Sequence, residues 1–214
     1  MSLIYDNYIF DLDGTIINSS KEVLLCLKKA FEKSDYNINE NNLTSNLIGP
    51  PIKQIVQAIA PELQNEDKIS EIISNFRYFY DNEQNDISEI YPFVYETLEY
   101  LKSFNKKMFI ATFKPKKSTM RIIKQFNLNY FDDIYTIDKF DRHITKEEMI
   151  GDIIYNYNLN KSDTVMVGDA KTDMTAAKSC GITAIGALWG YGDDKQPLIE
   201  SADITIRGIK ELWD

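Results

Sequence analysis

Two carboxylates separated by one residue, Asp11 and Asp13, directly follow a short apolar run. That run, 8–10, combines aromatic and β-branched residues and is typical of a buried strand. Gly14 then ends the strand. Because side chains alternate along a strand, we expect both carboxylates to point to the same side. Two acids in this position favour a metal site, a nucleophile with its acid partner, or both.

Polar residues also follow three later strands that the sequence predicts. In chain order these are Thr112 with Lys114, then Lys146, and finally Asp169 with Asp173. The carboxyl ends of parallel strands share one edge of a sheet, where ligands of such sheets bind. We therefore expect these residues to converge with Asp11 and Asp13.

Four converging carboxylates would repel one another, and burial would increase the repulsion. A divalent cation relieves it, and oxygen ligands without Cys or His favour Mg²⁺. Thr112 and Lys146 supply a hydrogen-bond donor and a positive charge. The helix predicted to open at Pro115 offers free N–H groups suited to a phosphate. This combination predicts phosphoryl transfer.

Each feature alone has an ordinary structural explanation. Asp13 with Gly14 would form a turn, Thr112 would cap a helix, Lys146 would lie on a solvated helix face, and Asp169 and Asp173 would favour a helix start. All of them fall in order at strand ends, and this coincidence favours function.

Strands and helices alternate through most of the chain. Strands are predicted at 8–10, 107–112, 133–137, 164–167, 182–185 and 203–206, and helices at 93–104, from 115, at 145–157 and at 171–180. Such alternation indicates parallel β-α-β units with right-handed crossovers. The expected fold class is α/β, a Rossmann-like parallel-sheet core sandwiched by helices.

The segment 19–89 shows helical periodicity and no convincing strand. Gly49, Pro50 and Pro51 punctuate the entry to one of its helices. We therefore expect a discontinuous core of 1–18 and 90–214, with an all-helical cap domain of 19–89 inserted after the first strand.

Composition excludes several classes of protein. Hydrophobic residues make up 43% of the 214 residues, which argues against wholesale disorder, and the net charge of -9 argues against a nucleic-acid partner. The longest apolar run, 182–189, is far below the ~20 residues of a membrane helix, and no signal peptide is expected. Cys26 and Cys180 are expected to be reduced thiols of a cytoplasmic protein. His143, the single histidine, is expected in a surface loop.

The motifs together resemble the haloacid-dehalogenase-like hydrolases, in particular phosphoglycolate-phosphatase-like and nucleotidase-like members with a helical cap. The resemblance spans nearly the whole chain. It rests on FDLDGT at 10–15, ATFK at 111–114, Lys146, VGDAKTD at 167–173 and ITAIGALWGYG at 182–192.

The resemblance implies a role for each matching residue. Asp11 would be the nucleophile that forms an aspartyl-phosphate, and Asp13 the general acid and then base. Thr112 would hold the transferring phosphoryl group, and Lys146 would neutralise charge. Mg²⁺ would be bound by Asp11, the backbone carbonyl of Asp13 and Asp169, with Asp173 as a further ligand or an orienting group. Phosphate or substrate contacts would come from Thr15, Phe113 and Lys114, and from Gly49 and Lys53 in the cap.

Three departures from the family pattern bear on the substrate or on Lys146. Asn18 and Phe113 stand where many members carry Asp and Ser or Asn, and Lys146 lacks a neighbouring proline. The first two lie at the entrance or the phosphate loop and leave the identity of the substrate open, and the third bears on the assignment of Lys146.

The sequence thus predicts a Mg²⁺-dependent phosphatase, monomeric or homodimeric, that acts on a small phosphorylated metabolite. Phosphoglycolate, a nucleoside monophosphate and pyrophosphate are all open as substrates. A sugar phosphomutase of the same fold is the alternative within enzymes. A phosphoaspartate signalling module is the alternative from another class, although the helical insertion and the D-x-D-G-T spacing argue against it.

Overall fold

The computed structural model describes residues 5–82, 87–140, 142, 144–191 and 195–214. The chain forms two compact units, one made of 1–18 and 90–214 and the other of 19–89. His143, expected in a surface loop, lies outside the described residues. Among the residues described, no helix has the length and apolar character needed to cross a membrane.

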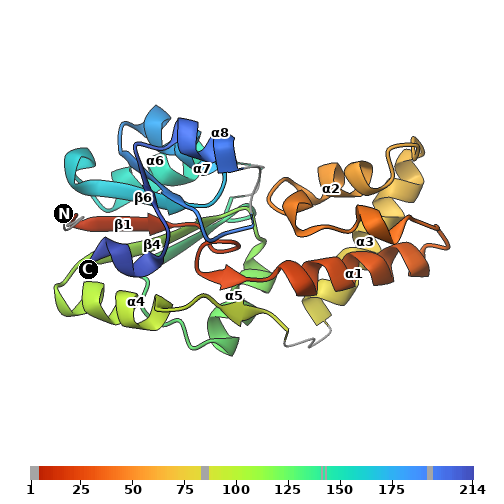
Figure 1. Ribbon diagram of the computed structural model, residues 1–214, viewed down its shortest axis with the longest axis horizontal. Coiled ribbons are helices and arrows are strands. Elements are labelled where there is room, and N and C mark those ends of the chain that lie inside the picture. Colours follow the sequence, from red (N-terminus) through yellow and green to blue (C-terminus); the bar gives the residue numbers. More distant parts are fainter. Residues whose placement is uncertain (1–4, 83–86, 141, 143, 192–194) are drawn as a thin grey trace. The chain divides into compact units, whose positions relative to one another are not determined.

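The first unit is built on a six-stranded parallel sheet with the strand order β5-β4-β1-β6-β7-β8 (Figure 1). Its strands are β1 (Asn7–Phe10), β4 (Lys107–Thr112), β5 (Asp133–Thr136), β6 (Thr164–Gly168), β7 (Thr183–Ala187) and β8 (Ile204–Ile206). β1 lies between β4 and β6, and Phe10 is in register with Ile110 and Val167. The predicted α/β fold class is confirmed.

Helices cover both faces of this sheet (Figure 1). One face carries α4 (Val94–Ser103), α5 (Lys116–Gln125) and the 3₁₀ helix η4 (Ile209–Leu212); the other carries α6 (Lys146–Asn156), α7 (Lys171–Cys180) and α8 (Lys195–Ser201). Tyr8 and Phe10 belong to the first hydrophobic cluster and Ile9 to the second. Alternation along β1 therefore fills both layers, which fixes the strand end that carries Asp11.

Two features of the helices in this unit are not evident from the sequence. In α5, Met120 is 45% exposed, although Ile122 and Ile123 of the same helix are buried. The helix α8 was not predicted, because it has only seven residues and contains Pro197. A short 3₁₀ turn, η3 (Lys161–Asp163), precedes β6.

The second unit is helical, with α1 (Ser20–Lys33), α2 (Ile52–Ile59) and α3 (Glu66–Asn82). Leu27 and Phe31 of α1 and Ile72 and Phe76 of α3 are buried, as expected for two amphipathic helices that contact each other. The Asn-rich segment between α1 and α2 holds two 3₁₀ turns, η1 (Glu40–Asn42) and η2 (Ser45–Leu47).

The chain passes between the two units through a small two-stranded sheet. Its strands, β2 (Ile17–Asn18) and β3 (Glu89–Ile90), contain two residues each. Strands this short leave no periodicity in the sequence, so neither was predicted.

Candidate active site

The sheet brings the predicted polar residues to one edge. Asp11 follows β1, Thr112 ends β4, Asp169 follows β6, Lys146 opens α6, and Asp173 lies in the first turn of α7. Carboxylate oxygens of Asp11, Asp169 and Asp173 all lie within 4.8 Å of one another. Residues separated by more than a hundred positions in the chain thus form one acidic cluster.

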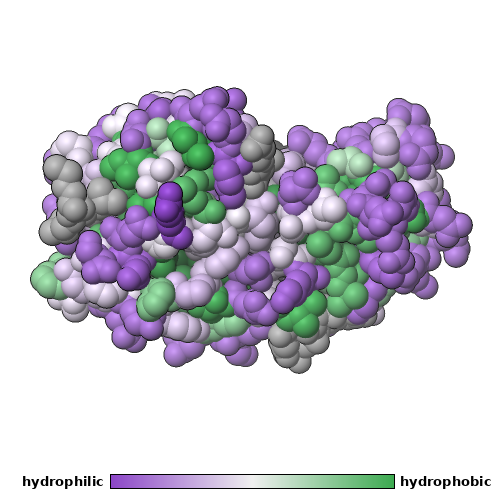
Figure 2. Space-filling model, in the orientation of Figure 1, coloured by the Kyte–Doolittle hydropathy of each residue, from purple (hydrophilic) through white to green (hydrophobic). Residues whose placement is uncertain are grey.

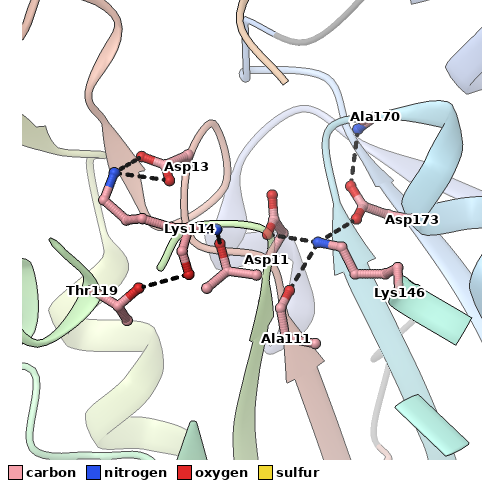
Figure 3. A network of polar contacts seen from close by, with 9 residues as sticks. Asp11, Asp13, Ala111, Lys114, Thr119, Lys146, Ala170 and Asp173 are labelled. Carbon is pink, nitrogen blue, oxygen red and sulfur yellow. Dashed lines mark hydrogen bonds and ion pairs between the residues drawn. The ribbon is translucent and has the colours of Figure 1, made fainter. Parts of the chain in front are cut away.

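Lys146 lies between two of these carboxylates (Figure 3). Its Nζ is 2.8 Å from Oδ1 of Asp11, 2.9 Å from Oδ1 of Asp173 and 2.8 Å from the carbonyl oxygen of Ala111. Its side chain is only 4% exposed. Thr145 and Glu148 form a capping box that starts α6 at Lys146. Thr145, one of the two non-proline neighbours of this lysine, is therefore the residue that caps the start of α6.

Burial and charge shift the pKa values of this group. Burial raises the pKa of Asp11 to about 7; Lys146 opposes that shift, and the charge of Asp173 adds to it. Burial alone would lower the pKa of Lys146, but the two facing carboxylates outweigh burial and raise it. The lysine therefore stays cationic and compensates part of the buried negative charge.

Asp13 is paired with a second buried lysine. Nζ of Lys114 is 2.9 Å and 3.1 Å from the two carboxylate oxygens of Asp13 (Figure 3). The loop that carries Lys114 is fixed locally: its N–H donates to Oγ1 of Thr112, and its carbonyl accepts from Oγ1 of Thr119. Lys114 was expected at a phosphate or substrate. In the structure it pairs with Asp13, and its contact with phosphate or substrate stays a prediction.

Three glycines lie in close contact with residues of the acidic cluster. A Cβ on Gly14, whose φ is +83°, would lie 2.1 Å from Oδ2 of Asp169. A Cβ on Gly190 would lie 2.3 Å from Cβ of Asp169, and one on Gly168 would lie 2.4 Å from Oδ2 of Asp173. Only glycine fits at these three positions without displacing a carboxylate. Sequence reasoning gave Gly190 no role, although the Trp-Gly-Tyr-Gly run after β7 was the available signal.

The loop after Asp13 is held by two aromatic residues. Nε1 of Trp189 donates to the carbonyl of Thr15 at 3.1 Å, and the N–H of Tyr91 donates to the carbonyl of Ile16 at 3.2 Å. Thr15 was expected at the phosphate, but its side chain is fully buried. Its hydroxyl has no hydrogen-bond partner among the described residues. Burial raises the pKa of Tyr91, and the charges of Asp169 and Asp13 act in the same direction.

Three further residues, Phe113, Lys53 and Gly49, were expected to contact the phosphate or the substrate. The ring of Phe113 lies with its centroid 5.1 Å from Nζ of Lys146. Lys53 and Gly49 belong to the helical unit, where Lys53 pairs with Glu66 at 2.8 Å on the surface and Gly49 has a φ of +135°. A substrate role for these three residues stays a prediction.

A family model described as haloacid dehalogenase-like hydrolase matches residues 8–187. The chain belongs to this family, as its motifs predicted, and it is an enzyme of the hydrolase class. The matched segment runs from β1 to the end of β7, so it contains the acidic cluster and both lysines described above.

Two named relatives are similar to this chain over nearly their whole length. The chain is 26% identical to a phosphoglycolate phosphatase of Vibrio parahaemolyticus, with 96% of this chain and 93% of that protein covered. It is also 26% identical to the pyrophosphatase PpaX of Halalkalibacterium halodurans, with 96% and 94% covered. Among solved structures, a putative phosphatase from Clostridium difficile superimposes with a TM-score of 0.85 at 26% identity, covering 98% and 97% of the two chains.

Proposed function

We propose that this protein is a Mg²⁺-dependent phosphatase that hydrolyses a small phosphorylated metabolite through an aspartyl-phosphate on Asp11. The observation that carries the proposal is the cluster of Asp11, Asp169 and Asp173 within 4.8 Å, neutralised in part by Lys146. A nucleophile, a buried cation and a set of oxygen ligands at one sheet edge are the parts that phosphoryl transfer needs.

In the first step, a carboxylate oxygen of Asp11 attacks phosphorus and the bond from phosphorus to the leaving oxygen breaks. Asp13 gives its proton to that oxygen. In the second step, Asp13 takes a proton from a water that attacks the same phosphorus. Inorganic phosphate leaves and the Asp11 carboxylate is regenerated. Lys146 offsets charge on the nucleophile and the phosphoryl group, while Thr112 binds the transferring group.

The donor set fits a hard divalent cation, because carboxylate oxygens converge without any sulfur or imidazole in the cluster. Asp11, Asp169 and the backbone carbonyl of Asp13 would hold Mg²⁺. When bound, the cation supplies charge stabilisation to the phosphoryl oxygens. Oδ1 of Asp173 forms an ion pair with Lys146, and its Oδ2 accepts a hydrogen bond from the N–H of Ala170. We therefore assign it to orienting Lys146 and shaping the cluster.

The names of two relatives support the proposed substrate class. Proteins named phosphoglycolate phosphatase and pyrophosphatase align with almost the full chain, so phosphoglycolate and pyrophosphate are candidates beside nucleoside monophosphates. The helical unit of 19–89 would act as a substrate-selecting cap, with Gly49 and Lys53 among its contacts. Phe113 and Lys114 would line the phosphate loop. We assign the protein to the cytoplasm, since Cys26 and Cys180 are buried free thiols.

A panel of phosphorylated metabolites tests this function, with phosphate release measured with and without Mg²⁺. Wild type should release phosphate from at least one small ester, and removal of Mg²⁺ by a chelator should stop the release. Asp11→Asn should be inactive on the same substrate while its circular dichroism matches that of wild type. Folded wild-type protein that turns over no phosphoester in the panel would overturn the proposal.

A further inference from the structure

A groove of about 350 Å³ lies on the α/β unit between the turn before α4 and the start of η4. Its walls include Tyr91, Phe93, Trp189, Arg207, Ile209 and Lys210. On the visible face of this unit, hydrophobic patches are bordered by hydrophilic side chains (Figure 2). A volume of this size accommodates a small organic ligand.

Three aromatic residues, Tyr91, Phe93 and Trp189, are among the nine residues that line the groove. The rings of Tyr91 and Trp189 meet edge to face with centroids 6.4 Å apart. The side chain of Phe93 is 51% exposed, and its φ of +65° lies in the left-handed region that bulky residues rarely adopt. That backbone conformation is strained for a bulky residue, yet it leaves about half of the Phe93 side chain exposed to water. The apolar walls suit a flat aromatic group.

The groove is lined by two cations, Arg207 and Lys210, and by the carboxylate of Glu211. Among the residues that the structure describes, none bonds to the guanidinium of Arg207, whose backbone N–H alone donates to Glu211 at 2.8 Å. Nζ of Lys210 lies 5.6 Å from the centroid of the Phe93 ring and 3.1 Å from Asp214. Arg207 is therefore the cation available to an incoming anion, which a guanidinium binds with two parallel hydrogen bonds.

We propose that this groove is a second ligand site that takes a small planar aromatic molecule carrying one anionic group. The ring would lie against Phe93 and Trp189, and the anion would pair with Arg207. The site is separate from the phosphate chemistry of the sheet edge but shares two residues with its support. Trp189 and Tyr91 line the groove and also hold the loop that follows Asp13.

Isothermal titration with naphthalene-2-sulfonate tests the site on the full-length protein. We expect binding with a dissociation constant below 1 mM, about tenfold weaker binding of neutral naphthalene-2-methanol, and no binding of methanesulfonate, which lacks the ring. Arg207→Gln should weaken the sulfonate at least tenfold. Phe93→Asn, which tolerates the left-handed backbone, should weaken both naphthalene probes.

Lys124→Gln is the matched control, because Lys124 is an exposed cation of the same unit that does not line the groove. It should bind the sulfonate as wild type does. The proposal is overturned by unchanged binding to Arg207→Gln, by equal affinity for the neutral probe, or by displacement of the probe by inorganic phosphate with Mg²⁺. Dissociation of a dimer into monomers on addition of the probe would also overturn the proposal, since the groove would then be the binding surface for a second copy of the chain.

Discussion

Gly190→Ala tests the idea that close glycines fix the acidic cluster. The added Cβ would lie 2.3 Å from Cβ of Asp169 and 2.4 Å from the carbonyl oxygen of Gly14. Non-bonded carbon atoms prefer about 3.5–4.0 Å. Asp169 or the loop at Gly14 must therefore move by roughly 1 Å. A displacement of this size lowers the reaction rate on the order of 10²-fold when it affects groups that position the reacting atoms.

Two quantities should change in Gly190→Ala. Overpacking should lower the free energy of unfolding by about 1–3 kcal/mol. Mg²⁺ affinity should fall about 10–100-fold, as it does when the support of a ligand is disturbed. Urea unfolding measures the first quantity. Isothermal titration of the metal-free protein with Mg²⁺ measures the second without relying on turnover.

Gly151→Ala is the matched control. Gly151 lies inside α6, and a Cβ there would meet nothing within 4 Å. Replacing a helical glycine by alanine should stabilise the protein by about 0.5–1 kcal/mol, with unchanged Mg²⁺ affinity. If Gly190→Ala bound Mg²⁺ like wild type and unfolded at the same urea concentration, the glycine argument would be refuted.

Three further outcomes follow from the charges of the site. Lys146→Met should leave Asp11 and Asp173 buried without their shared cation and cost about 3–5 kcal/mol in urea unfolding of the metal-free protein; unchanged stability would show that the ion pairs contribute nothing. Because burial raises the folded-state pKa of Asp11 to about 7 from an ordinary value of 3.8, the stability it contributes is fully present below about pH 4 and is lost as pH rises through 7. The metal-free protein should lose stability over that window, Asp11→Asn should flatten the loss, and an equal slope in both proteins would contradict the assignment. Asp13→Asn should slow release of the alcohol from an alkyl phosphate about 10²–10⁴-fold in the first turnover, but release of nitrophenolate from p-nitrophenyl phosphate much less, since nitrophenolate leaves without a proton. Later turnovers of both substrates should slow, because Asp13 is also the base for the attacking water. Equal losses in the first turnover would argue against Asp13 as the acid.

The strand ends were predictable because buried parallel strands leave a strong signal. The runs at 8–10, 107–112 and 164–167 are mainly apolar, and they end at or just before Asp11, Thr112 and Gly168. The structure has strands at all three places. Parallel connectivity then required their carboxyl ends to share an edge. The convergence of Asp11 and Asp169 therefore followed from topology alone.

Side-chain pairing was beyond the sequence, because it depends on contacts between distant segments. Lys114 and Asp13 are 101 positions apart, and nothing local marks their ion pair. The role of Gly190 likewise depends on the approach of the turn after β7 to Asp169, which only the folded sheet creates.

The stereochemical course at phosphorus tests the central claim most directly. A substrate ester made chiral with oxygen isotopes and sulfur would be hydrolysed by the wild-type enzyme, and the configuration of the released thiophosphate determined. Transfer to Asp11 followed by attack of water comprises two in-line displacements, so the account predicts overall retention of configuration. Inversion would mean that water attacks the substrate directly and would contradict an aspartyl-phosphate on Asp11.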